Sequence, residues 1–140
     1  MKFRFEECIE RGKIVKIPID PALVEKELHE AAADLAAAEH SFQENQMKWA
    51  IIQGYYSLFH SLRSRVFAKG YREKSHRCLR YAVEALLIDS RELDPDVLNS
   101  FSFAMDLRKG ADYGCIYDAE SAGTVVLSAR TVYETIQKIV

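Results

Sequence analysis

The sequence contains little cysteine, proline or glycine. Its 140 residues include three cysteines, three prolines and six glycines. The cysteines, Cys8, Cys78 and Cys115, are odd in number and far apart, so we expect neither a disulfide framework nor a CxxC metal knuckle. Buried packing roles in a reducing compartment are the expectation for all three. The sequence also lacks internal repeats, low-complexity tracts and linkers.

The chain has no excess of charge of either sign. Lys and Arg number 19 against 21 for Asp and Glu, which gives a net charge of −2 at pH 7. This balance excludes a basic nucleic-acid coat protein but permits a local basic patch. Long apolar runs are missing, and no apolar stretch follows the basic start, so we expect neither a membrane span nor a secretory signal. With 49% hydrophobic and 29% charged residues, the composition predicts a cytoplasmic globular protein.

What the sequence does contain is a helical hydrophobic period. Asp20–Pro21 and Asp94–Pro95 each offer an N-cap followed by proline in the first turn. Gly70 and Gly110 each follow an apolar-periodic run, where a helix commonly ends. The pattern predicts five helices, at about Pro21–Asn45, Met47–Lys69, Ser75–Asp89, Pro95–Lys109 and from Asp118 to the end.

The second predicted helix is apolar over most of its circumference, which is typical of a central helix. Before the first helix, Phe5–Arg11 fits a short helix ending at Gly12, and Ile14–Ile19 fits an extended packing arm. The sequence therefore predicts an all-α, up-and-down helical bundle of about five helices. We expect one domain over residues 1–140, with residues 1–19 as an N-terminal arm or short helix and 20–140 as the bundle.

A basic cluster surrounds the corner between the second and third predicted helices. From residue 63 to residue 80 there are seven cations against one acid, Glu73. Guanidinium and ammonium groups gathered at one corner suit phosphate groups, although a solvated loop with basic ends is an equal alternative. Ser75 and His76 stand near a helix N-terminus, which also favours an anion. The cations are Arg63, Arg65, Lys69, Arg72, Lys74, Arg77 and Arg80.

Arg108 is the second feature of chemical interest. It continues an apolar stripe of the fourth predicted helix, so it lies at a rim, an interface or a site, or pairs with Asp112 at the helix end. The histidines have no helical metal-pair spacing, and a buried hydrogen-bonding role is the simpler interpretation of His60. There is no P-loop, Rossmann, nucleophile-elbow or zinc motif, so we expect no metal and no cofactor.

Four segments together resemble the HEPN superfamily of small helical domains. They are Ala32–Ala38, Trp49–His60 with its double tyrosine, Gly70–His76 and Arg108–Tyr113. The resemblance spans Asp20 to Val140 and implies an up-and-down bundle, commonly dimeric, with a cleft near the end of the fourth helix. Many members of that superfamily are metal-independent ribonucleases. Others are toxin–antitoxin components beside a small nucleotidyltransferase, or nucleotide-binding and accessory domains.

The ribonuclease motif of that superfamily is an arginine followed four to six residues later by a histidine. Arg108 matches the arginine, but Tyr113 stands where the histidine belongs. A phenol, with a pKa of about 10, is a poor base near neutral pH, whereas imidazole suits that task. The resemblance makes Arg108, Asp112 and Tyr113 the candidate catalytic residues: a phosphate ligand, its orienting carboxylate and a stacking or hydrogen-bonding group.

The main hypothesis is a nucleotide- or RNA-binding module that forms a homodimer. It would act with a nucleotidyltransferase partner or in a toxin–antitoxin or defence setting. One alternative is a metal-independent endoribonuclease that lacks the usual histidine and uses Arg108 at the scissile phosphate, with Asp112 or Tyr113 in support. Another is a purely protein-binding helical module. The candidate nucleotide- or phosphate-binding residues are Tyr56, His60, Arg72, Lys74, Ser75 and His76.

Overall fold

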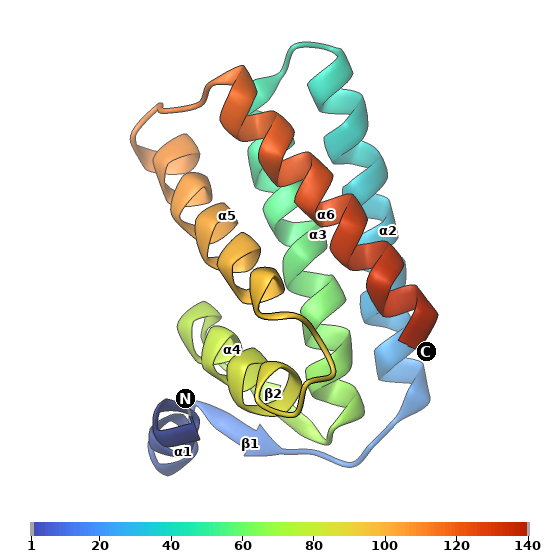
Figure 1. Cartoon of the computed structure of the whole chain (residues 1–140), viewed down its shortest axis with the longest axis vertical. Coiled ribbons are helices and arrows are strands. Elements are labelled where there is room, and N and C mark those ends of the chain that lie inside the picture. The colour runs from blue at the N-terminus through green and yellow to red at the C-terminus, as the bar shows by residue number, and fades with distance from the viewer. Residues whose placement is uncertain (1, 140) are drawn as a thin grey trace.

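Three long helices form the frame of the molecule in the computed structural model, which describes residues 2–139. They are α2 (Pro21–Gln43), α3 (Met47–Ala68) and α6 (Ala119–Ile139), and α5 (Pro95–Tyr113) leans across α3 beside them (Figure 1). Helix α3 packs against all three of the others. Its Tyr55, Leu58 and Leu62 are fully buried, so the prediction of a central second helix is confirmed.

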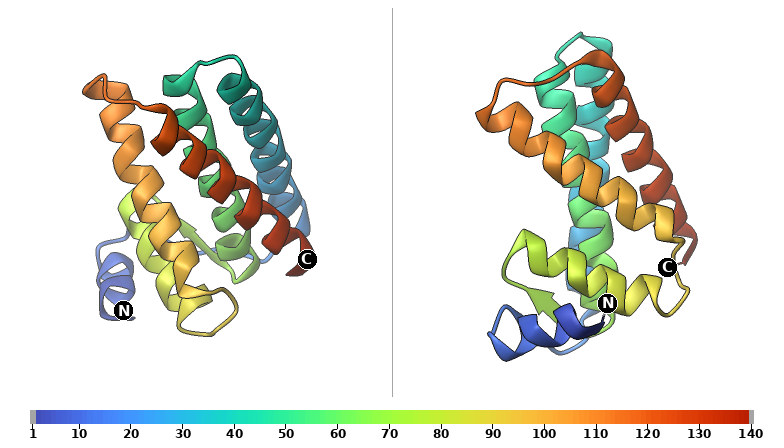
Figure 2. Two further views of the ribbon diagram at one scale, coloured as in Figure 1. Left: turned by 45° about the horizontal axis from the view of Figure 1, so that its top comes forward. Right: turned by 60° about the vertical axis from the view of Figure 1, so that its left-hand side comes forward.

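The smaller elements gather at one end of this frame. Helix α1 (Lys2–Glu10) and strand β1 (Ile14–Lys16) precede α2, and strand β2 (Tyr71–Glu73) follows α3. The two strands are antiparallel, with Val15 opposite Arg72. Helix α4 (His76–Val83) continues into a π-helical turn, η1 (Glu84–Ile88), and α1 lies alongside α4 (Figure 2).

The predicted helix starts are confirmed by their caps. The Asp20 side chain accepts a hydrogen bond from the backbone N–H of Ala22 at 3.0 Å, and the Asp94 side chain accepts one from Asp96 at 2.9 Å. Each satisfies an N–H group that has no partner within its own helix. The predicted all-helical class is confirmed, with the short β1–β2 pair as its one addition among residues 2–139.

One predicted helix end is wrong, and one predicted helix that ends where expected changes its winding. Gly110 lies inside α5, which continues to Tyr113, because the next residue, Ala111, is buried and packs in the core. The predicted third helix is α-helical only to Val83 and then widens into the π-helical turn. A single π turn inserts one residue without breaking the helix, so the apolar period does not reveal it.

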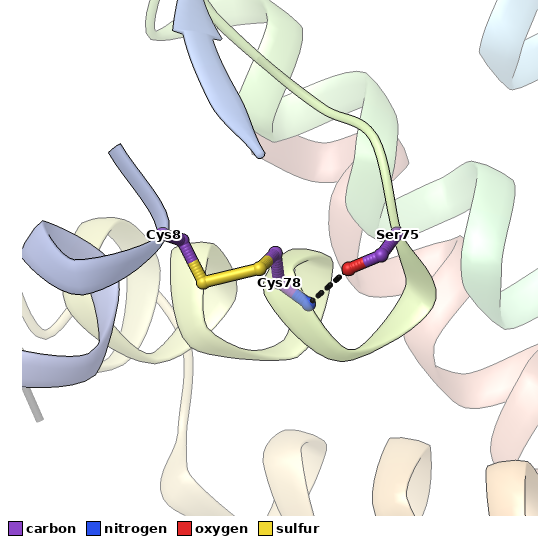
Figure 3. Close-up of a disulfide and its surroundings, with 3 residues drawn as sticks. All are labelled: Cys8, Ser75 and Cys78. Atoms are coloured by element: carbon purple, nitrogen blue, oxygen red, sulfur yellow. Dashed lines mark hydrogen bonds between the residues drawn. A yellow bond between two sulfur atoms is a disulfide. The ribbon is translucent and has the colours of Figure 1, made fainter. Parts of the chain in front are cut away.

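The expectation for the cysteines is also wrong. Cys8 of α1 and Cys78 of α4 form a disulfide, with Cα atoms 6.0 Å apart (Figure 3). Both are buried, whereas Cys115 is exposed and free. The pairing joins residues 70 positions apart, so only the docking of α1 against α4 makes it visible.

Among the described helices, none is long and apolar enough to cross a membrane.

Candidate functional site

Arg108 meets the double tyrosine of α3. Its Nη1 donates a hydrogen bond to the Tyr56 hydroxyl at 3.1 Å, and its guanidinium carbon lies 5.1 Å from the centre of the Tyr55 ring. The Asp112 carboxylate is 4.0 Å from Nη1. The Arg108 Nε atom is buried and has no acceptor among residues 2–139. Arg108 is therefore held in one orientation while part of its donor capacity is unused.

His76, the first residue of α4, also contacts Tyr55. Its Nδ1 shares a hydrogen bond with the Tyr55 hydroxyl, and its ring stacks on Phe59 with 4.7 Å between the ring centres. The Nε2 atom has no hydrogen-bond partner in the described part of the chain. The structure thus brings together three residues that are far apart in the sequence: Tyr55, His76 and Arg108.

The surroundings of His76 keep its ring neutral. Burial, followed by the positive charges of Arg108, Arg63 and Lys109, lowers the pKa of His76 below its ordinary value of 6.5. Burial also raises the pKa of Tyr55, so the phenol keeps its proton. A neutral imidazole can accept a proton at one nitrogen and donate a hydrogen bond from the other.

Arg108 and His76 line one cavity between α4 and α5, the Arg108 cavity, with a volume of about 380 Å³. Arg80 also lines it and donates a hydrogen bond to Ser102 on the opposite wall at 2.6 Å. Positive charge dominates these walls, which favours an anionic ligand. The cavity is lined by one acid, Asp106, and by four permanently charged cations: Arg77, Arg80, Arg108 and Lys109.

A second cavity, the Arg72 cavity, lies on the other side of His76 and has a volume of about 630 Å³. Arg72, Lys74 and Ser75, all named from the sequence as phosphate ligands, line it together with His76. The Ser75 hydroxyl accepts a hydrogen bond from the Cys78 N–H at 3.1 Å and caps α4. His76 is the residue shared by the two cavities, so a ligand can reach it from either side.

Part of the predicted basic cluster is neutralised inside the fold. Arg63 donates to Glu73 at 3.0 Å and to Glu27 at 3.4 Å, while Arg65 and Lys69 lie within 4.0 Å of Glu92. Burial alone would raise the pKa of Glu27, but the hydrogen bond from His60 and the charge of Arg63 outweigh it and lower that pKa. These cations stabilise the fold, and four of the seven remain open to a ligand: Arg72, Lys74, Arg77 and Arg80.

Four of the predicted site residues line neither cavity: Tyr56, His60, Asp112 and Tyr113. Tyr56 and Asp112 lie beside Arg108 instead. His60 is 2.9 Å from Glu27 and 3.8 Å from Asp34, so it belongs to the buried charge network. Tyr113 is 80% exposed at the end of α5. The sequence analysis does not name Tyr55 or Lys109 as site residues. The only signal in the sequence for either of them is its position next to a named residue, Tyr56 or Arg108.

Other parts of the surface are less suited to chemistry. A larger hollow, about 730 Å³, lies between α2 and α6, and its charged lining residues Glu25 and Lys26 offset each other. Within residues 2–139, no group of three His, Cys, Asp or Glu side chains is placed to hold a metal ion.

Comparison with known proteins decides the family. The HEPN domain model matches residues 24–139, which is nearly the whole chain. The chain belongs to the HEPN domain family. The resemblance inferred from the four sequence segments is confirmed, and this HEPN domain is helical, as expected. Membership supports a function related to nucleotides or RNA in general terms. No curated protein matches the chain.

Proposed function

We propose that this HEPN domain binds nucleotides or RNA by holding phosphate groups in the Arg108 cavity. The observation that carries the proposal is the fixed orientation of Arg108, between the Tyr56 hydroxyl and the Tyr55 ring, with a buried Nε that has no acceptor. A guanidinium fixed in this way loses little entropy on binding and matches the geometry of a phosphate.

The side chains around Arg108 allow the site to bind more than one phosphate group. Arg77, Arg80 and Lys109 add positive charge to the Arg108 cavity. The Nε2 of His76 can donate to a phosphate oxygen when the Tyr55 hydroxyl donates to Nδ1. Beyond His76, the Arg72 cavity supplies further cations for an adjacent phosphate. An RNA strand therefore suits the site better than a single nucleotide.

Calorimetric titration with adenosine monophosphate and with a short RNA tests the proposal. We expect saturable binding that Arg108→Ala weakens about tenfold or more, because a charge-assisted hydrogen bond contributes about 1.5–3 kcal/mol. Arg130→Ala is the matched control, since Arg130 pairs with Glu39 and Glu134 on the surface. Equal affinities of wild type and Arg108→Ala, or the absence of binding, would refute the proposal.

Cleavage of RNA is a second candidate, favoured by the neutral imidazole of His76 beside Arg108. His76 Nε2 would take the proton of a 2′-hydroxyl, and the 2′-oxygen would attack the adjacent phosphorus. The bond from phosphorus to the 5′-oxygen would break, and that oxygen would receive a proton from the imidazolium. Arg108 would stabilise the negative charge that develops on the non-bridging oxygens of the phosphate. The products are a 2′,3′-cyclic phosphate and a 5′-hydroxyl.

End-labelled RNA incubated in EDTA separates cleavage from binding. Cleavage predicts cyclic-phosphate products that both His76→Ala and Arg108→Ala abolish. Intact RNA with wild-type protein would contradict the ribonuclease hypothesis and leave binding in place. Activity that survives both substitutions would indicate a contaminating nuclease.

We also propose that the protein acts as a homodimer, with a nucleotidyltransferase-type partner or in a toxin–antitoxin or defence setting. HEPN domains often dimerise, and Tyr113, Ile116 and Tyr117 expose apolar surface at the end of α5. Light scattering tests the dimer, and affinity purification of the tagged protein tests the partner. The protein-binding alternative and the cytoplasmic location stay predictions.

A further inference from the structure

A third basic cavity, the α1–α4 groove, lies between α1 and α4 and has a volume of about 460 Å³. Most of its charge comes from residues before position 24, where the match to the HEPN family begins. Arg4, Glu7, Cys8 and Arg11 all line it. They are spaced three, four and seven residues from Arg4, which places them on one face of the α1 helix and its end.

Positive charge in the groove is not neutralised by the fold. Its cations are Arg4, Arg11, Lys13 and Arg77, against the one carboxylate of Glu7. All four cations are exposed, and none has a carboxylate of residues 2–139 within 4.0 Å. Unpaired cations concentrated in a concave surface raise the local concentration of anions.

The groove is also held in shape. The Cys8–Cys78 disulfide lies in its lining and ties α1 to α4 (Figure 3). Nearby, the Phe5 ring packs edge-on against Tyr71 with 5.3 Å between the ring centres, and the Lys13 carbonyl accepts a hydrogen bond from Lys74 N–H at 2.8 Å. Arg4 on α1, and Arg11 and Lys13 in the turn that follows it, are therefore presented on a fixed frame, which lowers the entropy lost when a ligand binds.

The groove adjoins the two cavities around His76 and shares lining residues with each. Arg77 and Tyr81 line both the groove and the Arg108 cavity, and Ser75 lines both the groove and the Arg72 cavity. All three hollows thus meet around the first turns of α4. Along α1, Arg4 and Arg11 are separated by about 10 Å, at 1.5 Å per residue, so the groove is extended rather than a pocket for one small anion.

From this adjacency and the unpaired cations we infer that the α1–α4 groove binds the sugar–phosphate backbone of single-stranded RNA that continues from the Arg108 cavity. The inference rests on the proposed function and extends it to a new part of the chain. Exposed cations on a fixed surface suit backbone phosphates without selecting a base sequence, as in grooves that track single strands. The Glu7 carboxylate opposes binding.

Binding of two fluorescent oligouridylates, a trinucleotide and a dodecanucleotide, tests the groove by anisotropy. Arg4→Gln/Arg11→Gln should weaken the dodecanucleotide about tenfold and reduce the slope of log K against log salt concentration by about 1.4, at about 0.7 per phosphate contact. The trinucleotide has too few phosphates to occupy the Arg108 cavity and the groove together, so its affinity should change less than about twofold. Glu7→Gln should strengthen binding of the dodecanucleotide.

Lys26→Gln/Lys138→Gln removes the same charge from exposed positions outside the groove and is the matched control. The groove is refuted if the control lowers dodecanucleotide affinity as much as Arg4→Gln/Arg11→Gln, or if neither pair changes it. Equal competition by polyglutamate would also refute RNA as the ligand. If Arg108→Ala leaves trinucleotide binding unchanged, the proposed function fails, which is a separate outcome.

Discussion

The Tyr56 hydroxyl and the Tyr55 ring orient Arg108, the residue on which the proposed function depends. Tyr56 and Arg108 are 52 positions apart, yet the Tyr56 hydroxyl accepts a hydrogen bond from Arg108 Nη1 at 3.1 Å. The Tyr55 ring beneath the guanidinium supplies the second support. Without these two rings, Arg108 would be a flexible cation near a helix end. A ligand would then have to order the guanidinium, and the entropy lost would weaken binding.

Tyr56→Phe keeps the ring and removes only the acceptor for Arg108. We expect RNA affinity to fall about threefold to tenfold, since one hydrogen bond to a charged group is lost but the guanidinium remains. Tyr133→Phe is the matched control, because the Tyr133 hydroxyl accepts from Gln137 on the surface. Fluorescence titration of both variants measures the effect, and equal affinities would contradict an orienting role for Tyr56.

At this scale the sequence identified several of the right residues but not their neighbours in space. Arg108 and His76 were both candidates, and only folding places them around Tyr55. Tyr113 matched the family spacing, yet five residues along a helix turn a side chain about 140° from Arg108. Asp112, four residues along, stays on the Arg108 face and reaches it at 4.0 Å. The spacing of the motif along the sequence therefore does not by itself show which of the two side chains lies near Arg108.

At the scale of elements, α3 and α6 pack unusually closely at one glycine. A Cβ atom at Gly54 of α3 would lie 2.8 Å from Val125 Cγ1 of α6, and Val125 is buried and branched at Cβ. Branched side chains have few rotamers in a helix, so Val125 has no easy way to move aside. The absence of a side chain at Gly54 therefore allows α3 and α6 to pack this closely.

Gly54→Ala should lower the free energy of unfolding by up to about 2 kcal/mol. The overpacking penalty of about 1–3 kcal/mol exceeds the gain in helix propensity, about 1 kcal/mol. Gly123→Ala is the control: its Cβ would lie 3.4 Å from Phe42 Cζ, so the propensity gain should leave stability unchanged or higher. Urea unfolding compares the two, and equal stabilities would contradict the close approach at Gly54.

The sequence predicted the elements well where local chemistry determines them. Aspartate followed by proline fixed the starts of α2 and α5, because a cap is a short-range interaction. The end of α5 was mispredicted because the burial of Ala111, a tertiary effect, carries the helix through Gly110. The β1–β2 pairing joins Ile14 to Glu73, and no local pattern encodes a contact of that range.

On the scale of the whole molecule, the disulfide fixes the N-terminal segment to the bundle. It closes a loop with a sequence separation of 70 residues. In the loop-entropy model, a cross-link of that length stabilises the fold by about 4 kcal/mol. The odd number of cysteines concealed the pairing from the sequence, since Cys115 is free and exposed.

Cys8→Ser/Cys78→Ser should therefore lower the free energy of unfolding by about 2–4 kcal/mol. The α1 helix should also dock less firmly, so that dodecanucleotide affinity falls as it does in Arg4→Gln/Arg11→Gln. Cys115→Ser, the control, should change neither quantity. Denaturant unfolding and anisotropy provide the two readouts. Unchanged stability of the double serine variant would contradict a structural disulfide.

The most direct test of the phosphate site is the pKa of His76, measured by NMR with and without saturating RNA. In the free protein we expect that pKa below 6.5, because burial and the nearby cations disfavour the imidazolium. A bound phosphate offsets part of the positive charge around His76, so its pKa should rise on binding, and affinity should increase as the pH falls through the pKa of the bound state toward that of the free state. A His76 pKa that stays unchanged when RNA is bound would contradict the account, because the phosphate would then lie elsewhere.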